Sequence, residues 1–112
     1  MKICLTGHNG FLGKQISNFF EKNNSISKIN LRNIKIENDF NKNFFLSQFD
    51  KADFIINCAA CLNPKSENDF FINQLLPKLI ATNVDIYLKN CIFIHLSTIN
   101  VLIDGRKDQY TK

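Results

Sequence analysis

The chain has no tryptophan, only two prolines and only four glycines among its 112 residues. It also lacks an apolar run that approaches the roughly 20 residues needed to span a bilayer. Met1 leads directly into a short apolar run, so the chain shows no signal-peptide pattern. We therefore expect a soluble cytoplasmic protein without a membrane partner, and the length is enough for one small domain.

Positive charge is only weakly in excess. Fourteen Lys and Arg residues against ten Asp and Glu residues give a net charge of +4. The basic residues are spread along the whole chain, whereas a nucleic-acid-binding domain gathers them on one face. We expect a solvated surface of mixed charge and no nucleic-acid partner.

Cysteine is present in four copies, and most of these lie in or against apolar runs, where a free thiol behaves as a small buried hydrophobe. Cys58 and Cys61 have the C-x-x-C spacing of a redox pair or half a zinc site. The chain has no second Cys or His pair with ligand spacing, since His8 and His95 are isolated. We therefore expect free thiols and no metal site.

Short apolar runs alternate with amphipathic runs along the chain, as in proteins with a parallel sheet covered on both faces. The runs predict strands at 2–6, 27–31, 53–58 and 91–97 and a helix at 11–22. A second helical stripe follows Ser66 and Asp69, which have capping-box spacing, and Pro77 should bend or interrupt it. The pattern predicts an α/β protein with a doubly wound parallel sheet.

Two segments are harder to assign. Residues 34–37 (IKIE) have a strand-like pattern, but only two residues separate them from the strand before. Parallel neighbours need a crossover of a dozen or more residues. These residues therefore form either a hairpin-like edge or a reduced third strand, and residues 43–49 form a short helix or a turn.

Three of the four glycines fall within seven residues, at Gly7, Gly10 and Gly13, where the first strand should become a helix. A turn that binds pyrophosphate needs glycines for the tight bend, for the approach of the phosphates and for close helix packing. The phosphate loop of nucleotide hydrolases does not fit, because His8 stands at its first glycine and Gln15 replaces its Ser or Thr.

The T-G-x-x-G-x-x-G pattern of residues 6–13 resembles the short-chain dehydrogenase/reductase superfamily. The G-F-L-G segment within it resembles the extended branch of nucleotide-sugar epimerases, dehydratases and reductases. DFIINCAA (53–60), FFINQLLPKLI (70–80, with Asn73) and CIFIHLSTINV (91–101) resemble further segments of that branch, in the same order. The resemblance implies a Rossmann fold truncated after its fifth strand, with residues 1–112 as an incomplete NAD(P)-binding domain that lacks the C-terminal substrate domain.

The resemblance also implies a set of cofactor-binding positions. It places the glycine turn and the backbone N–H groups after it at the pyrophosphate, an alanine pair beside the ribose, and an aspartate at the adenine amino group. These positions are Gly7, Gly10, Phe11, Leu12 and Gly13, then Ala59 and Ala60, then Asp39. A solvated turn carboxylate explains Asp39 equally well.

The choice between NAD and NADP depends on the end of the second strand. NAD-binding members carry an acid there that holds the ribose hydroxyls, but residues 30–33 contain none. Arg32 lies in this region, and a guanidinium suits the 2′-phosphate of NADP. The sequence therefore favours NADP over NAD, although Arg32 can also be read as a plain surface arginine.

Catalysis in the family resembles a scheme in which a Tyr is the general acid/base and a Lys four residues later lowers its pKa. A Ser or Thr hydroxyl binds the reacting oxygen. Thr98, with Ser97 beside it, and Tyr110 are the matching residues, but the chain ends at Lys112, before the required Lys. Either that Lys follows just beyond, or Tyr110 belongs to a substrate loop and the catalytic pair lies further on.

The resemblance thus implies the NAD(P)-binding part of a nucleotide-sugar epimerase, dehydratase or ketoreductase. Such an enzyme works by hydride transfer, takes a nucleotide-sugar substrate and can form a homodimer. The alternative is a non-catalytic dinucleotide-binding module or the product of a truncated gene.

Overall fold

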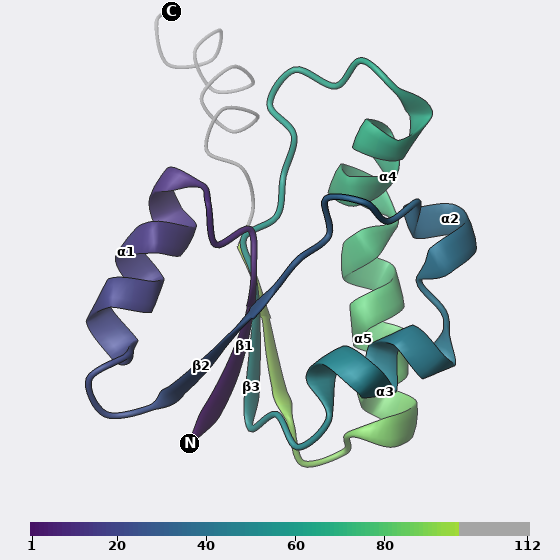
Figure 1. Cartoon of the computed structure of the whole chain (residues 1–112). Coiled ribbons are helices and arrows are strands. Elements are labelled where there is room, and N and C mark those ends of the chain that lie inside the picture. Colours follow the sequence, from purple (N-terminus) through teal and green to yellow (C-terminus); the bar gives the residue numbers. More distant parts are fainter. Residues whose placement is uncertain (97–112) are drawn as a thin grey trace, which may run out of the picture.

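The computed structural model describes residues 1–96, and Ser97, Thr98 and Tyr110 lie outside this part. Strands and helices alternate along it (Figure 1). The elements are β1 (Lys2–Thr6), α1 (Phe11–Phe20), β2 (Ser25–Ile29), α2 (Ile36–Asp39), α3 (Lys42–Phe49), β3 (Phe54–Asn57), α4 (Glu67–Gln74), α5 (Leu76–Tyr87) and β4 (Ile92–His95).

The four strands of the described part form one parallel sheet in the order β2-β1-β3-β4. The pairing register places Thr6 opposite both Ile29 and Asn57, and Asn57 opposite His95. The carboxyl ends of all four strands therefore lie at one edge of the sheet. This arrangement confirms the predicted α/β Rossmann-like fold.

The prediction that residues 34–37 form a strand is wrong. Ile36 begins the helix α2, and the sheet of the described part has four strands rather than five. Ile36 and Phe40 are both buried, and their four-residue spacing fits one face of a helical turn. Four residues with two alternating isoleucines do not distinguish this spacing from the two-residue period of a strand.

Strand β2 also begins and ends two residues earlier than predicted, at Ser25 and Ile29. Asn30, Leu31 and Arg32 therefore follow the strand, at the edge where the carboxyl ends meet. The other strands and the first helix match the predicted positions within one to two residues at each described end.

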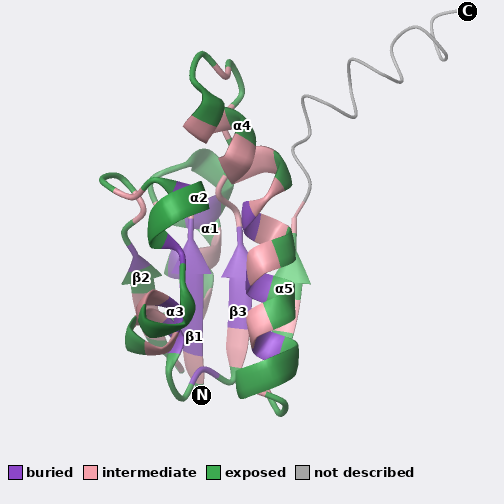
Figure 2. Cartoon of the chain, turned by 90° about the vertical axis from the view of Figure 1, so that its right-hand side faces the viewer, coloured by how far each residue is buried: buried purple, intermediate pink, exposed green. Residues whose placement is uncertain are grey.

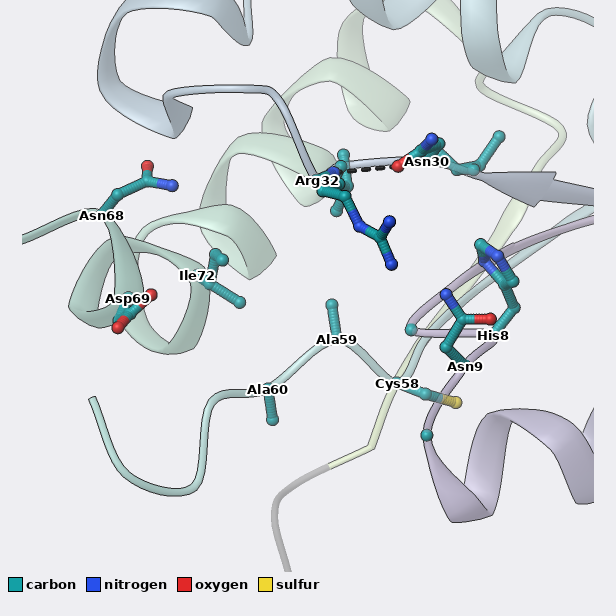
Figure 3. Close-up of a pocket in the computed structure, with 14 residues that line it drawn as sticks. His8, Asn9, Asn30, Arg32, Cys58, Ala59, Ala60, Asn68, Asp69 and Ile72 are labelled. Atoms are coloured by element: carbon teal, nitrogen blue, oxygen red, sulfur yellow. Dashed lines mark hydrogen bonds between the residues drawn. The ribbon is translucent and has the colours of Figure 1, made fainter. Parts of the chain in front are cut away.

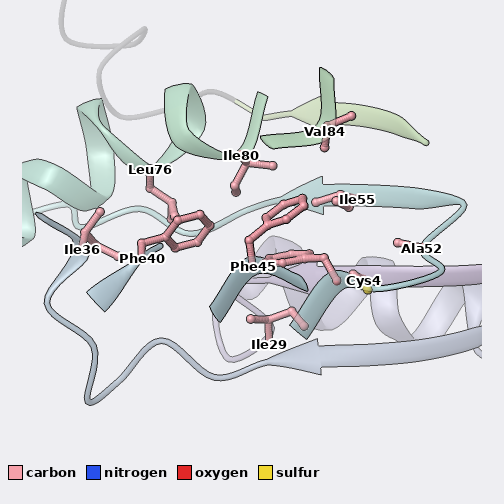
Figure 4. Packing of buried hydrophobic residues seen from close by; sticks show 11 residues of the cluster. Cys4, Ile29, Ile36, Phe40, Phe45, Ala52, Ile55, Leu76, Ile80 and Val84 are labelled. Carbon is pink, nitrogen blue, oxygen red and sulfur yellow. The ribbon is translucent and has the colours of Figure 1, made fainter. Parts of the chain in front are cut away.

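The two faces of the sheet are covered differently. Helix α1 packs on one face, and α2, α3, α4 and α5 lie on the other (Figure 1). Central strands β1 and β3 are the most buried part of the fold (Figure 2). The larger core lies under α2–α5, where Phe45 and Phe49 of α3 stack with ring centroids 5.0 Å apart among aliphatic side chains from the sheet and α5 (Figure 4).

The helical stripe after β3 is divided into two helices, as Pro77 predicted. Helix α4 ends before Leu75, and α5 begins with Pro77 in its first turn, where the missing N–H costs no helical hydrogen bond. The capping box of Ser66 and Asp69 is also confirmed at the start of α4. Of the helices described, none combines the length and apolar character needed to cross a membrane.

Candidate functional site

A hollow of about 530 Å³ lies at the carboxyl edge of the sheet (Figure 3). Its walls come from the segments that follow three neighbouring strands and from one side of α4. The lining comprises Gly7–Gly10 after β1, Ile29–Arg32 around the end of β2, Cys58–Ala60 after β3, and Asn68, Asp69 and Ile72 of α4. The chain order reverses between β1 and β3, and open α/β sheets bind ligands at such a switch point.

Gly7 and Gly13 are required by contacts within the chain. Gly7 has φ of 72°, and a Cβ built there would lie 2.5 Å from the backbone N of Ala59. A Cβ at Gly13 would overlap the carbonyl oxygen of Gly7 and lie 2.9 Å from Cα of His8. These glycines fix the tight turn and the close packing of α1 on it.

Gly10 is different, because a Cβ there would meet only the Gly7 oxygen, at an ordinary 3.5 Å. Gly10 lines the hollow and is the N-cap of α1, with extended backbone and no side-chain cap. The N–H groups of the first helical turn, including those of Phe11 and Leu12, have no partner within a helix. The open space at Gly10 and this helix end suit an anionic group.

The β3 side of the hollow carries Cys58, Ala59 and Ala60. The segment is held from α4, because Oδ1 of Asn73 accepts the N–H of Cys61 at 2.8 Å and Nδ2 donates to the Cys61 carbonyl at 2.9 Å. Burial raises the pKa of the Cys58 thiol. The small side chains of the two alanines leave room for a flat, partly apolar group.

The β2 side of the hollow carries Asn30 and Arg32. The N–H of Arg32 donates to Oδ1 of Asn30 at 2.9 Å, which turns the chain directly after the strand. Arg32 is exposed, and its guanidinium points into the hollow between Ala59 and Asn9 (Figure 3). It is the cationic side chain among the lining residues.

Asp39 lies elsewhere. It ends α2, its carboxylate accepts the N–H of Lys35 at 2.8 Å, and it is not among the residues that line the hollow. This geometry gives Asp39 the role of a local cap and does not bring it together with the other predicted cofactor residues.

The α4 side of the hollow was not predicted from the sequence. Asn68, Asp69 and Ile72 line it, and only the capping-box spacing pointed to one of them. The N–H groups of Lys65 and Ser66 donate to Asp69 and hold the pKa of its carboxyl below the usual range. No local signal identifies Asn68, because its partners are more than 30 positions away.

A polar row crosses the floor of this edge. The hydroxyl of Thr6 donates to Oδ1 of Asn57, and Nδ2 of Asn57 lies 3.1 Å from Nδ1 of His95. Thr6 and Asn57 are fully buried. The row connects β1, β3 and β4, and the segments that follow β1 and β3 line the hollow.

Two further observations concern what the described part of the chain could bind. Nδ1 of His8, on its lining, is buried without a hydrogen-bond partner in the described part of the chain. An orphaned polar atom on the lining of an open hollow fits a site where a polar ligand supplies the missing partner. All four cysteines are free thiols, and residues 1–96 contain no group of three or more His, Cys, Asp or Glu side chains suited to a metal ion.

No protein-family model matches the chain, and no curated protein matches it. Among solved structures, the chain is similar to a dTDP-4-dehydrorhamnose reductase, an RfbD ortholog from Clostridium acetobutylicum, with 28% sequence identity and a TM-score of 0.63. The match covers 83% of this chain and 34% of the reductase chain.

A second solved structure, the protein lin1944 from Listeria innocua, is 18% identical with a TM-score of 0.55. That match covers 75% of this chain and 48% of the other, and it concerns the fold alone. The chain therefore has an α/β Rossmann-like fold that it shares with a dTDP-4-dehydrorhamnose reductase over about a third of that enzyme's length.

Proposed function

We propose that this chain is the cofactor-binding part of an NAD(P)-dependent reductase that acts on a nucleotide-linked sugar. The carrying observation is the hollow at the carboxyl ends of β1, β2 and β3, with the glycine turn and the start of α1 on its wall. Dinucleotides bind at this position in sheets of this type. The likeness to a dTDP-4-dehydrorhamnose reductase favours reduction over epimerisation or dehydration.

The residues of the hollow fit a dinucleotide. The pyrophosphate would lie at Gly10, where the N–H groups of Phe11 and Leu12 begin α1. Ala59 and Ala60 would face a ribose. Arg32 would pair with a 2′-phosphate, so we propose NADP in preference to NAD.

The chemistry proposed for the whole enzyme uses residues outside the described part. The bound cofactor supplies the hydride. Thr98 or Ser97 would donate a hydrogen bond to the sugar carbonyl oxygen, and Tyr110 is the proposed general acid that protonates it. The homodimer stays a prediction of the family resemblance, and the cytoplasmic location stays a prediction from the sequence pattern.

Binding of NADPH and NADH, measured by isothermal titration calorimetry, tests the proposal. Gly10→Asp is the informative variant, because Asp is a good helix N-cap yet places a negative charge where the pyrophosphate would lie. Gln15→Glu is the charge-matched control, since Gln15 is exposed on α1 and outside the lining.

We expect the native chain and Gln15→Glu to bind NADPH, and Gly10→Asp to retain its thermal stability while losing binding. Native chain that folds cooperatively but binds neither dinucleotide at millimolar concentration would contradict the proposal. Equal affinities of native chain and Gly10→Asp would place any binding elsewhere and would also contradict it.

A further inference from the structure

Asn68 lies on α4, yet its side chain is bound to the segment that follows β2. Its Oδ1 accepts the N–H of Ile36 at 2.7 Å, and its Nδ2 donates to the carbonyl oxygen of Ile34 at 3.1 Å. The oxygen and the nitrogen of one side-chain amide thus bind backbone groups 32 and 34 positions away, respectively. We call this pair of hydrogen bonds the Asn68 clamp.

Both partners of the clamp are themselves anchored. The capping box fixes the start of α4, because Asp69 accepts the N–H groups of Lys65 and Ser66 and Ser66 accepts that of Asp69. Ile36 is fully buried in the larger core. The clamp therefore connects a rigid helix start to a fixed point of the backbone.

Arg32 lies between two such fixed points. Before it, Asn30 accepts the Arg32 N–H at the end of β2, and after it the Asn68 clamp holds residues 34–36. Figure 3 shows Asn68 and Arg32 on opposite sides of the hollow that both of them line. Release of the clamp would free one end of the short segment that directs the guanidinium.

Asn73 makes a second clamp of the same chemistry from the same helix. Its amide holds the N–H and the carbonyl of Cys61, after β3, and makes no contact with the Arg32 segment among its hydrogen bonds. Helix α4 thus holds two loops of the hollow independently, and each clamp is a control for the other.

We propose that Asn68 is a specificity-determining positioning residue, which holds the Arg32 segment so that the guanidinium meets the 2′-phosphate of NADP. The inference rests on the proposed function, since it concerns how the same hollow distinguishes two dinucleotides. Asn68 acts through the backbone of residues 34–36 rather than by contact with the phosphate.

The test compares dissociation constants for NADPH and NADH, from the fluorescence of the reduced nicotinamide, in the native chain, Asn68→Leu, Asn73→Leu, Arg32→Gln and the Asn68→Leu/Arg32→Gln double variant. Loss of two neutral hydrogen bonds should weaken NADPH binding in Asn68→Leu by about tenfold, with a much smaller change for NADH. Asn73→Leu should weaken the binding of NADPH and the binding of NADH by the same factor. Asn68→Asp, which keeps the acceptor for Ile36 and loses the donor to Ile34, should fall between native and Leu.

The double variant separates positioning from direct contact. If Asn68 acts through Arg32, Asn68→Leu should change the ratio of the NADPH and NADH dissociation constants in the native background. It should leave that ratio unchanged in the Arg32→Gln background. An unchanged ratio in Asn68→Leu, or an equal change in both backgrounds, overturns the inference. Native chain that binds both cofactors equally also overturns it, together with the preference for NADP, while dinucleotide binding in the hollow stands.

Amide hydrogen exchange at Ile36 is a readout that needs no cofactor. We expect faster exchange at Ile36 in Asn68→Leu than in native chain or Asn73→Leu, because the N–H loses its acceptor. If the exchange rate at Ile36 is the same in Asn68→Leu and in native chain, the Asn68 clamp is contradicted. A native chain that binds no dinucleotide overturns the proposed function and the specificity role, and the exchange result then reports separately on the clamp.

Discussion

The β1–α1 turn and the segment between β2 and α2 form two walls of the same hollow, but different contacts fix their backbones. In the β1–α1 turn, the glycines themselves permit the path, since Gly13 packs against Gly7 and His8, and Gly7 lies against the backbone of Cys58 and Ala59 after β3. In residues 30–36, the path depends on Asn68, which comes from a helix more than 30 positions later. The first wall depends on glycines whose spacing is visible in the sequence, and the second depends on a side chain that only the completed fold brings beside it.

The largest expected effect is on the glycine turn between β1 and α1. Gly13→Ala should lower the free energy of unfolding by about 3 kcal/mol or more, because its Cβ would overlap the backbone of Gly7, which has no freedom to move away from β3. Urea unfolding followed by far-UV circular dichroism measures the change. Gly10→Ser, with open space at its Cβ, should unfold near the native midpoint, and a Gly13→Ala chain as stable as native would show that the turn is not fixed by this contact.

The next effect concerns the polar row of Thr6, Asn57 and His95, which crosses β1, β3 and β4. Thr6→Val removes the hydroxyl that Asn57 accepts and leaves a fully buried amide oxygen unpaired, at an expected cost of about 1–3 kcal/mol. Thr6→Ser keeps the hydroxyl and loses only the methyl group, so its cost reports packing and not the hydrogen bond to Asn57. Equal unfolding midpoints for the Val variant and native chain would mean that the polar row contributes nothing to stability.

A smaller, pH-dependent effect is expected at the start of α4, which carries the Asn68 clamp. The folded pKa of Asp69 lies below its unfolded value, because backbone N–H groups bind the carboxylate. Its contribution is therefore present above the unfolded pKa, near 3.9, and is lost as pH falls through the lower folded pKa. Native chain should have a higher Tm than Asp69→Asn at pH 7, and the difference should shrink below pH 4. A difference that is constant from pH 7 to pH 3 would contradict this role.

The smallest effect is a change in thiol reactivity. Cys58 lines the hollow, and burial raises the pKa of its thiol, so iodoacetamide should modify it slowly at neutral pH. NADPH should slow the reaction further by covering the hollow. Cys91 is a control outside the lining, where burial raises the pKa to about 11. Mass spectrometry of the modified chain should show protection by NADPH at Cys58 alone, and equal protection of both thiols would argue against binding in the hollow.

The same contrast explains what could be predicted from the sequence. The strand that leads into the glycine turn, the helix after it, the capping box and the break at Pro77 are all encoded within a few residues, and each was predicted. Residues 34–37 were predicted as a strand because Ile34 and Ile36 alternate with polar residues. The core contacts of Ile36, where α2 begins, are not visible locally.

Asn68 was missed for the same reason. An asparagine in the first turn of a helix is common, and nothing near it in the chain identifies its partners at residues 34 and 36. Arg32 could be found from the missing acid after β2, whereas the clamp that directs it depends on the packing of α4 beside that segment.

The proposed function requires that a dinucleotide binds in the hollow at the carboxyl edge of the sheet. A titration of the isotopically labelled chain with NADPH, followed by amide proton–nitrogen NMR, locates the bound cofactor. We expect the largest shifts at Gly7–Gly10, at Arg32 and at Ala59 and Ala60. Shifts confined to other surfaces, or a spectrum unchanged at millimolar NADPH, would contradict the proposed function.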